Sequence, residues 1–169
     1  MSLVRASIAR MEGYTPGEQP RDRAYVKLNT NENPYPPSPR VREALRAFDP
    51  DRLRLYPDPL AMGLRRAAGA PFGLPPEWVL CGNGSDDLLT IALRTFVDQG
   101  SPVAYITPSY SLYPVLADLQ GALHRPVRLD ADFNLPGDAL EQAAGAPLLI
   151  LCRPNAPTGN AFALETMQA

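Results

Sequence analysis

The sequence has few of the side chains that bind metals or act as nucleophiles. Its 169 residues include one histidine (His124), one lysine (Lys27) and two cysteines. A metal site built on histidines is excluded by that count, and the two cysteines lack the spacing of a zinc site. There is also no Gly-x-Ser-x-Gly turn, so nothing indicates a serine hydrolase of the α/β class.

Long apolar runs and a strong excess of charge are missing as well. No apolar stretch approaches the roughly 20 residues that span a bilayer, and no charged-then-apolar leader opens the chain. The formal net charge of −2 gives no reason to expect nucleic acid or an anionic membrane as a partner. Cys81 and Cys152 lie inside apolar runs, which indicates reduced, buried thiols and a cytoplasmic protein.

Proline, by contrast, is abundant near the start of the chain. Five prolines lie between residues 16 and 37, and we expect residues 1–37 to form an arm with one short helix between Val4 and Met11. Residues 38–169 are expected to be the first, incomplete part of a larger domain. The final residues from Glu165 resemble the opening of a helix, which indicates that the sequence is truncated.

Two helices are expected before Pro71. One starts at Ser38-Pro39, where serine is a favourable N-cap and proline suits the first helical position. The other starts near Pro59. Their inward-facing apolar residues would be Val41, Leu45, Phe48, Leu60 and Leu64.

From residue 78 onward, short apolar runs alternate with helical patterns. The expected strands are 79–81, 103–107, 123–129 and 148–152, and the expected helices are 86–99, 109–120 and 136–144. Such alternation predicts an α/β fold with a mainly parallel sheet and helices on both faces. Ligands bind beyond the carboxyl ends of the strands in such sheets.

The segment Gly82-Asn83-Gly84-Ser85-Asp86-Asp87 follows one predicted strand and opens a helix. The free N–H groups of a helix start attract anions, and glycines let a phosphate approach the backbone. These residues therefore suit a phosphate site, with Ser85 as an extra donor. An ordinary turn with Ser85 or Asp86 as N-cap is the alternative.

Three further segments are rich in polar or aromatic groups. Tyr110 follows the strand at 103–107 and could stack on a planar ring or lie at a rim. Asn155 follows the strand at 148–152 and could aim an amide at a ligand or stabilise a turn. Residues 29–34 could bind a small polar ligand or form a turn.

The order and spacing of these motifs resemble the fold-type-I pyridoxal-phosphate aminotransferases of class I/II. Within them, the sequence is most similar to histidinol-phosphate aminotransferases. The resemblance covers essentially the whole chain, as an N-terminal portion of the family's sequence. The matching segments are Gly13–Gly17, Leu28–Pro34, Leu55–Asp58, Gly82–Asp87, Thr107–Tyr110 with Tyr113, and Pro154–Gly159.

The resemblance implies a set of residues that bind the cofactor, pyridoxal 5'-phosphate. They are Gly84, Ser85 and Asp86 at the phosphate, Tyr110 against the pyridine ring, Tyr56 reaching a neighbouring subunit's cofactor phosphate, and Asn155 at the phenolic oxygen. The stricter family pattern has Asn directly before Pro-Thr-Gly, whereas this sequence has Ala156 there, so the amide contact must come from Asn155 or be lost.

The resemblance also implies a substrate pocket and a reaction. Tyr14, Asn31 and Glu32 match positions that line the pocket, and the Tyr-x-Pro-Gly arm favours histidinol phosphate. The reaction would be transamination between this phosphorylated amino alcohol and 2-oxoglutarate, in histidine biosynthesis, by a homodimer. Lys27 lies in the arm and is expected to be a surface residue. The catalytic Schiff-base lysine would lie beyond Ala169, so we expect this fragment to be inactive alone.

Other functions remain open at the level of sequence. Within the superfamily, a threonine-phosphate decarboxylase or another amino-acid aminotransferase would share the cofactor motifs. From a different class, the chain would be a non-catalytic remnant or a module that binds a cofactor or phosphate, as the absence of a second lysine would suit.

Overall fold

The computed structural model describes residues 3–12 and 26–168. These residues form two compact units: 3–12 together with 82–168, here the sheet unit, and 26–81, here the helical unit. The division predicted from sequence, an arm over 1–37 followed by a larger domain, concerns a longer protein and stays a prediction.

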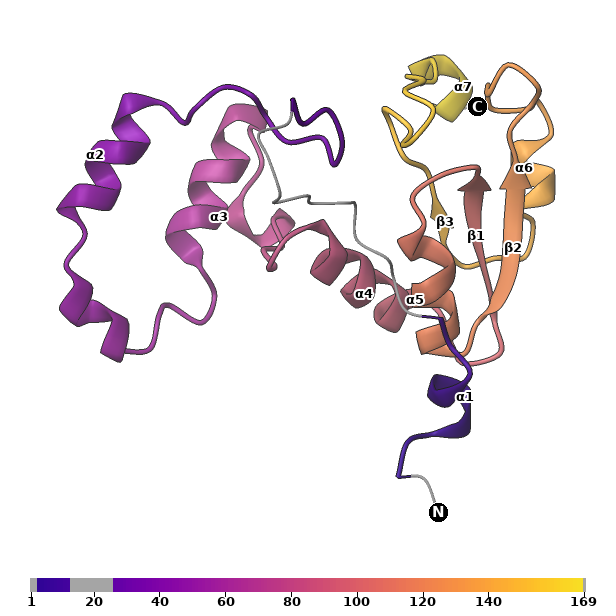
Figure 1. The fold of residues 1–169 in the computed structure, drawn as a ribbon, viewed down its shortest axis with the longest axis horizontal. Coiled ribbons are helices and arrows are strands. Elements are labelled where there is room, and N and C mark those ends of the chain that lie inside the picture. Colours follow the sequence, from indigo (N-terminus) through magenta and orange to yellow (C-terminus); the bar gives the residue numbers. More distant parts are fainter. Residues whose placement is uncertain (1–2, 13–25, 169) are drawn as a thin grey trace. The chain divides into compact units, whose positions relative to one another are not determined.

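The sheet unit is built on three parallel strands (Figure 1). They are β1 (Pro102–Thr107), β2 (Leu123–Arg128) and β3 (Leu149–Ile150), in the order β2-β1-β3. Tyr105 at the centre pairs with Pro126 on one side and Ile150 on the other. Pro126 is compatible with this position because β2 is an edge strand of the described sheet, where one side of the backbone needs no donor.

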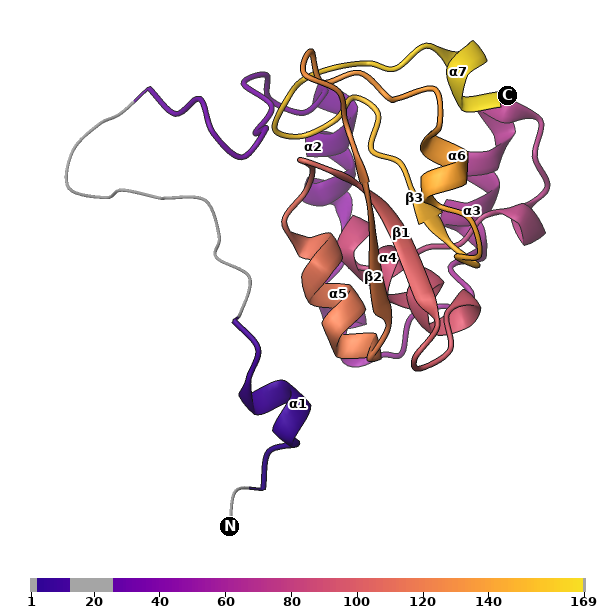
Figure 2. The ribbon, with the colours of Figure 1, turned by 90° about the vertical axis from the view of Figure 1, so that its right-hand side faces the viewer.

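Helices cover both faces of the strands, as the sequence predicts. On one face, Val103 and Tyr105 pack with α4 (Ser85–Phe96) and α5 (Leu112–Gln120). On the other, Ala104 and Ile106 pack near α6 (Ala139–Gln142) and α7 (Leu164–Gln168). Figures 1 and 2 show α5 and α6 on opposite sides of the strands. The short helix predicted near the start of the chain is α1 (Ala6–Ala9), which contacts α5.

One proline and one glycine agree with the bounds of α5. The helix begins at Leu112, later than the predicted 109, and Pro114 falls in its first turn, where a missing N–H does no harm. It ends at Gly121, whose φ of 70° is the left-handed conformation that glycine adopts without strain. Strand β3 and helix α6 are shorter than the ranges predicted for them.

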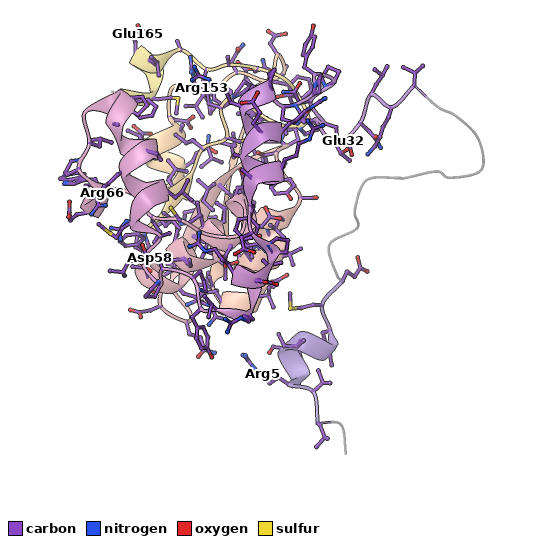
Figure 3. All side chains as sticks on the ribbon, turned by 90° about the vertical axis from the view of Figure 1, so that its left-hand side faces the viewer. Arg5, Glu32, Asp58, Arg66, Arg153 and Glu165 are labelled. Carbon is purple, nitrogen blue, oxygen red and sulfur yellow. The ribbon has the colours of Figure 1, made fainter. Side chains whose placement is uncertain are left out.

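The helical unit contains α2 (Pro39–Ala47) and α3 (Met62–Gly69), with 3-10 turns η1 (Pro50–Arg54), η2 (Ala70–Phe72) and η3 (Pro76–Trp78). The predicted start at Ser38-Pro39 is confirmed. Before α3, the Asp58 carboxylate (Figure 3) accepts hydrogen bonds from the N–H groups of Met62 (2.7 Å) and Leu60 (3.0 Å). Those two bonds lower the pKa of Asp58.

The expected inner faces of α2 and α3 and the expected strand at 79–81 are wrong. Leu60 and Leu64 are each 60% exposed, and the predicted inner face of α2 is exposed too, because the described residues of the helical unit contain no sheet for these helices to cover. Phe96 of α4, which the apolar pattern of that helix also predicts to face inward, is exposed too. Residues 79–81 are not a strand, since no strand of the described chain pairs with them.

Among the helices of the described residues, none is both long enough and apolar enough to cross a membrane.

The core of the sheet unit yields a direct test. Ile106 of β1 is fully buried, so Ile106→Ala should lower the free energy of unfolding by about 2–5 kcal/mol through lost burial and the cavity left behind. Leu119→Ala is the matched control, since that side chain is 46% exposed on α5 and should cost less than about 1 kcal/mol. Urea unfolding measures both values; equal losses would contradict the assigned core.

Candidate functional site

The start of α4 is shaped by two glycines. Gly84 precedes the helix with a φ of 87°, a backbone conformation that residues other than glycine rarely adopt. No side chain caps the helix there. Gly82 is close-packed, because a Cβ at that position would lie 2.8 Å from an oxygen of Asp87. The same carboxylate accepts a hydrogen bond from the N–H of Asn83 at 3.0 Å. The Asp87 carboxylate therefore stabilises the turn, and no side chain caps the N–H groups at the helix start.

This arrangement leaves backbone N–H groups available to bind an anion. Within the described residues, no acceptor is bonded to the backbone N–H groups of Ser85, Asp86 and Asp87. The positive end of the helix dipole lies at the same place. Both carboxylates in this first turn have partners within the protein, Asp87 at Asn83 and Asp86 at the phenol of Tyr110. The helix start can thus receive a phosphate through its backbone.

Tyr110 lies at the carboxyl end of β1 and is held from two sides. Its phenol donates to the Asp86 carboxylate at 3.3 and 3.4 Å. Its ring meets Tyr113 edge to face, with the ring centroids 5.7 Å apart. Asp86 and Tyr110, predicted separately as cofactor residues, are therefore neighbours.

Asn155 lies in the loop after β3 and reaches the loop after β1. Its amide accepts a hydrogen bond from Ser109 Oγ at 2.6 Å and donates to the carbonyl of Pro108 at 2.9 Å. It also donates to Thr158 Oγ1 at 2.9 Å within its own loop. The two loops thus meet at the end of the sheet where ligands bind in parallel α/β folds.

A pocket of about 350 Å³ opens at this end of β1. It is lined by residues 105–107 at the end of β1, by residues 108–111 of the loop that follows and by Pro157 of the loop after β3, together with Pro114 and Pro126. Its size is within the usual range for small-molecule sites.

The structure brings together five of the nine predicted site residues. Gly84, Ser85, Asp86, Tyr110 and Asn155 all belong to the sheet unit. Tyr56, Asn31 and Glu32 belong to the helical unit and are exposed, Tyr56 completely. Tyr14 lies outside the described residues. The roles predicted for these four residues stay predictions.

Lys27 and Glu32 form an ion pair within the helical unit. Asn31 beside Glu32 has a φ of 53°, and Thr30 one of 63°, so this segment makes a left-handed turn. Asn33 stabilises the next turn by accepting the N–H of Tyr35 at 2.9 Å.

Sequence reasoning missed the partners that hold the predicted residues in place. Ser109 and Thr158 bond the Asn155 amide. Their sequence signal is that both follow strands and lie in the family-like segments Thr107–Tyr110 and Pro154–Gly159. A second missed group is a chain of hydrogen bonds from Asp118 through His124 to Tyr105, with distances of 2.9 and 2.8 Å. Its members lie 6 and 19 residues apart, so no local pattern indicates it.

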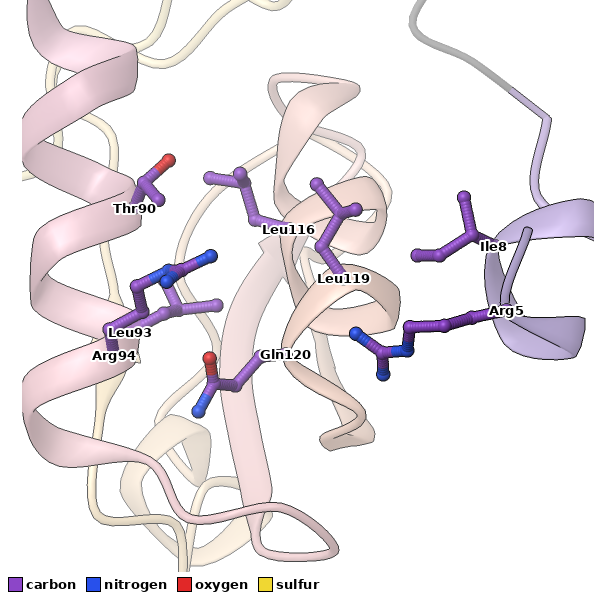
Figure 4. Close-up of a pocket in the computed structure, with 8 residues that line it drawn as sticks. All are labelled: Arg5, Ile8, Thr90, Leu93, Arg94, Leu116, Leu119 and Gln120. Atoms are coloured by element: carbon purple, nitrogen blue, oxygen red, sulfur yellow. The ribbon is translucent and has the colours of Figure 1, made fainter. Parts of the chain in front are cut away.

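Other cavities of the described residues contain none of the predicted site residues. One of about 390 Å³ lies beside α3 and η3, and one of about 540 Å³ lies between residues 7–12 and α5. A cavity of about 120 Å³ lies between α1, α4 and α5 (Figure 4), and none of its lining residues is a predicted site residue. The described residues contain no group of three or more His, Cys, Asp or Glu side chains that could hold a metal ion. Both cysteines are free, as expected, although each is only partly buried.

The parallel sheet with helices on both faces defines an α/β protein, and an open helix start and two joined loops lie at the carboxyl end of β1. Residues 23–169 match the sequence model of the class I and II aminotransferases, and the chain belongs to that family.

Within the family, the chain is similar to histidinol-phosphate aminotransferases. It is 45% identical over 169 residues to the one from Geotalea uraniireducens, which covers 99% of this chain and 48% of that protein. The chain therefore spans about half the length of the curated relatives it matches.

Solved structures confirm the predicted fold type. The histidinol-phosphate aminotransferase of Sinorhizobium meliloti in complex with pyridoxal 5'-phosphate matches with a TM-score of 0.68 and 29% identity, covering 76% of this chain and 35% of that one. A single mutant of Thermus thermophilus aspartate aminotransferase matches with a TM-score of 0.78, covering 99% and 49%; at 19% identity it shows the fold alone.

The tyrosines around the site predict how stability changes at alkaline pH. Burial, reinforced by Cys152, raises the pKa of Tyr113, and burial, reinforced by Asp118, raises the pKa of Tyr105. The folded state therefore keeps both phenols protonated where the unfolded chain ionises. The stability they contribute is fully present below about pH 10, the ordinary tyrosine pKa, and is lost as the pH rises further.

Urea unfolding between about pH 8 and about pH 11 measures this loss. Tyr113→Phe should make the decline of stability with pH shallower, whereas the exposed control Tyr35→Phe should decline as wild type does. A slope unchanged in Tyr113→Phe would contradict the environment assigned to that phenol.

Proposed function

We propose that the chain is the N-terminal portion of a pyridoxal-phosphate-dependent aminotransferase that transfers the amino group of histidinol phosphate to 2-oxoglutarate. This reaction would belong to histidine biosynthesis in the cytoplasm. The observation that carries the proposal is 45% identity, along 99% of this chain, to a histidinol-phosphate aminotransferase. The geometry of the sheet unit supports the cofactor named in the proposal, because a helix start with unbonded N–H donors and an aromatic side chain lie together there.

The described residues fit the cofactor. Its phosphate would be received by the N–H groups at the start of α4, from Ser85 to Asp87, which have no acceptor within the described residues. Gly84 has open space where a Cβ would lie, so an anion can approach the backbone closely. The ring of Tyr110 would provide the aromatic surface against which a planar cofactor stacks.

Each of these residues has a task that its own chemistry defines. The cofactor supplies an electron sink for bond breaking in the amino donor. The α4 start would neutralise phosphate charge with fixed N–H dipoles, while the Ser85 hydroxyl donates a 3.4 Å hydrogen bond to the Asp86 carboxylate. The Asp86 carboxylate accepts a hydrogen bond from the phenol of Tyr110 and so restricts rotation of that side chain. Asp87 holds the glycine turn through Asn83.

We assign no covalent role to Lys27. It is the one lysine of the sequence, and it is paired with Glu32 in the helical unit. We propose that the lysine that binds the cofactor belongs to a part of the enzyme outside these 169 residues, in keeping with a chain that spans about half of its curated relatives. The 169 residues alone should therefore be inactive.

The remaining predicted residues would complete the site in the whole enzyme. We propose that Tyr14, Asn31 and Glu32 line the pocket for the amino donor, and that Tyr56 contacts the cofactor phosphate of a second subunit in a homodimer. Complete exposure of the Tyr56 side chain is compatible with a contact made outside its own unit.

Activity on a donor panel tests the proposal. The full-length enzyme, loaded with pyridoxal phosphate, should convert 2-oxoglutarate to glutamate with histidinol phosphate as donor. Aspartate, aromatic amino acids and threonine phosphate should be used at least about tenfold less well, a difference of about 1.4 kcal/mol in transition-state binding. Equal use of another amino acid, or release of CO₂ from threonine phosphate, would reassign the substrate within the family. No spectral change with the cofactor would reject the proposal altogether.

The stacking role of Tyr110 is tested by two variants. Tyr110→Ala should raise the dissociation constant for pyridoxal phosphate by about two- to tenfold, as expected for an aromatic contact worth about 0.5–1.5 kcal/mol. Tyr110→Phe keeps the ring and is the matched control, so it should retain most of the affinity. Equal weakening by both variants would show that the phenol, and not the ring, carries the contribution.

A further inference from the structure

Asn155 is the one polar side chain that is buried among the described residues, with 2% of its surface exposed. A buried amide is costly unless all its hydrogen-bonding groups have partners. The partners of this amide therefore decide what the residue does.

Both N–H groups of the Asn155 amide are used within the protein. One donates to the carbonyl oxygen of Pro108 and the other to Thr158 Oγ1, each at 2.9 Å. The orientation of the amide is fixed chemically, because the Pro108 carbonyl can only accept and must face the nitrogen. The amide oxygen in turn accepts from Ser109 Oγ at 2.6 Å.

The backbone of Asn155 is equally engaged. Its N–H donates to the carbonyl of Asn160 at 2.8 Å, and its carbonyl accepts from Gly159 at 2.7 Å. These two bonds close the loop after β3 on itself. The side chain then joins this closed loop to Pro108 and Ser109, the two residues directly before Tyr110.

We propose that Asn155 is a positioning residue that sets the location of Tyr110, and not a direct ligand of the cofactor. An anionic phenolic oxygen on a ligand would need an N–H donor, and both N–H groups of this amide are already bonded to the protein. The inference replaces the contact expected from sequence for Asn155, and its meaning for the cofactor rests on the proposed function.

Tyr110 is thus fixed at both of its ends. The backbone before it is tied to the loop after β3 by Asn155, and its phenol is tied to Asp86 at the α4 start. The ring is packed edge to face on Tyr113. Removing the Asn155 amide should free the backbone end and leave the phenol end in place.

The first arm of the test needs no cofactor. In the full-length protein without pyridoxal phosphate, Asn155→Ala should lower the folding equilibrium constant by about ten- to a hundredfold, since it leaves buried partners unpaired. Hydrogen exchange of residues 107–113 and 155–160 should become faster. Asn160→Ala is the matched control in the same loop, because the Asn160 amide makes only a 3.4 Å contact with the carbonyl of Asp132. It should change both quantities by less than about twofold.

A milder pair of variants covers the case in which Asn155→Ala does not fold. Ser109→Ala removes one hydrogen bond to the amide, and Ser109→Thr keeps the hydroxyl. Ser109→Ala should speed exchange of the same two segments, and Ser109→Thr should restore the slow exchange. Failure of Ser109→Ala to alter exchange in 155–160 would overturn the tie between the loops.

The second arm of the test measures binding of the cofactor. Ser109→Ala and Asn155→Ala should both raise the dissociation constant for pyridoxal phosphate about three- to tenfold and alter the circular dichroism of the bound cofactor, with Ser109→Thr close to wild type. A direct ligand would give another pattern: unchanged stability and exchange without cofactor, weaker binding in Asn155→Ala, and no effect of Ser109→Ala. That pattern would overturn the proposal.

The two proposals fail in different ways. If the wild-type protein binds no pyridoxal phosphate, the proposed function is rejected, and the measurements without cofactor still decide whether Asn155 ties the loops. If wild type binds the cofactor but Asn155→Ala matches Asn160→Ala in stability and exchange, the positioning role alone is rejected.

Discussion

At the carboxyl end of the sheet, one buried amide joins two loops whose contact residues lie 46 and 47 positions apart in sequence. A buried amide with every N–H bonded has one orientation, because any other would leave a polar group without a partner in a region of low dielectric. Asn155 therefore ties the loop after β3 to the loop after β1 at this edge of the sheet. The direction of Tyr110 follows from that edge, and the aromatic side of the proposed cofactor site follows from Tyr110.

The second constraint is electrostatic and acts at the start of α4. Two acidic residues in the first turn interact favourably with the positive end of the helix dipole. Their carboxylates would nevertheless repel a phosphate if they faced it. The structure directs Asp87 to Asn83 and Asp86 to Tyr110, so the N–H groups remain available and the negative charges are bonded elsewhere. Gly84 supplies the backbone conformation that this turn requires.

The sequence predicted the parts of the structure that depend on local patterns. The parallel sheet, the helices on its two faces and the helix at Pro39 follow from apolar periodicity and capping signals. The roles of Leu60 and Leu64 were not predictable, because a helix pattern identifies an apolar side but not the surface that covers it. Residues 79–81 have the composition of a strand and lack a pairing strand in the described chain. The Asn155 contacts lie outside any local pattern, since they depend on which loops meet in the fold.

The central claim is that the backbone at the start of α4 receives the phosphate of the cofactor beside Tyr110. Titration of the full-length, isotope-labelled protein with pyridoxal phosphate, followed through its amide resonances, tests this most directly. We expect the largest shifts at the N–H groups of Ser85, Asp86 and Asp87, with smaller shifts at residues 107–111. Saturable binding that leaves the three N–H resonances unmoved and shifts a different segment would contradict it.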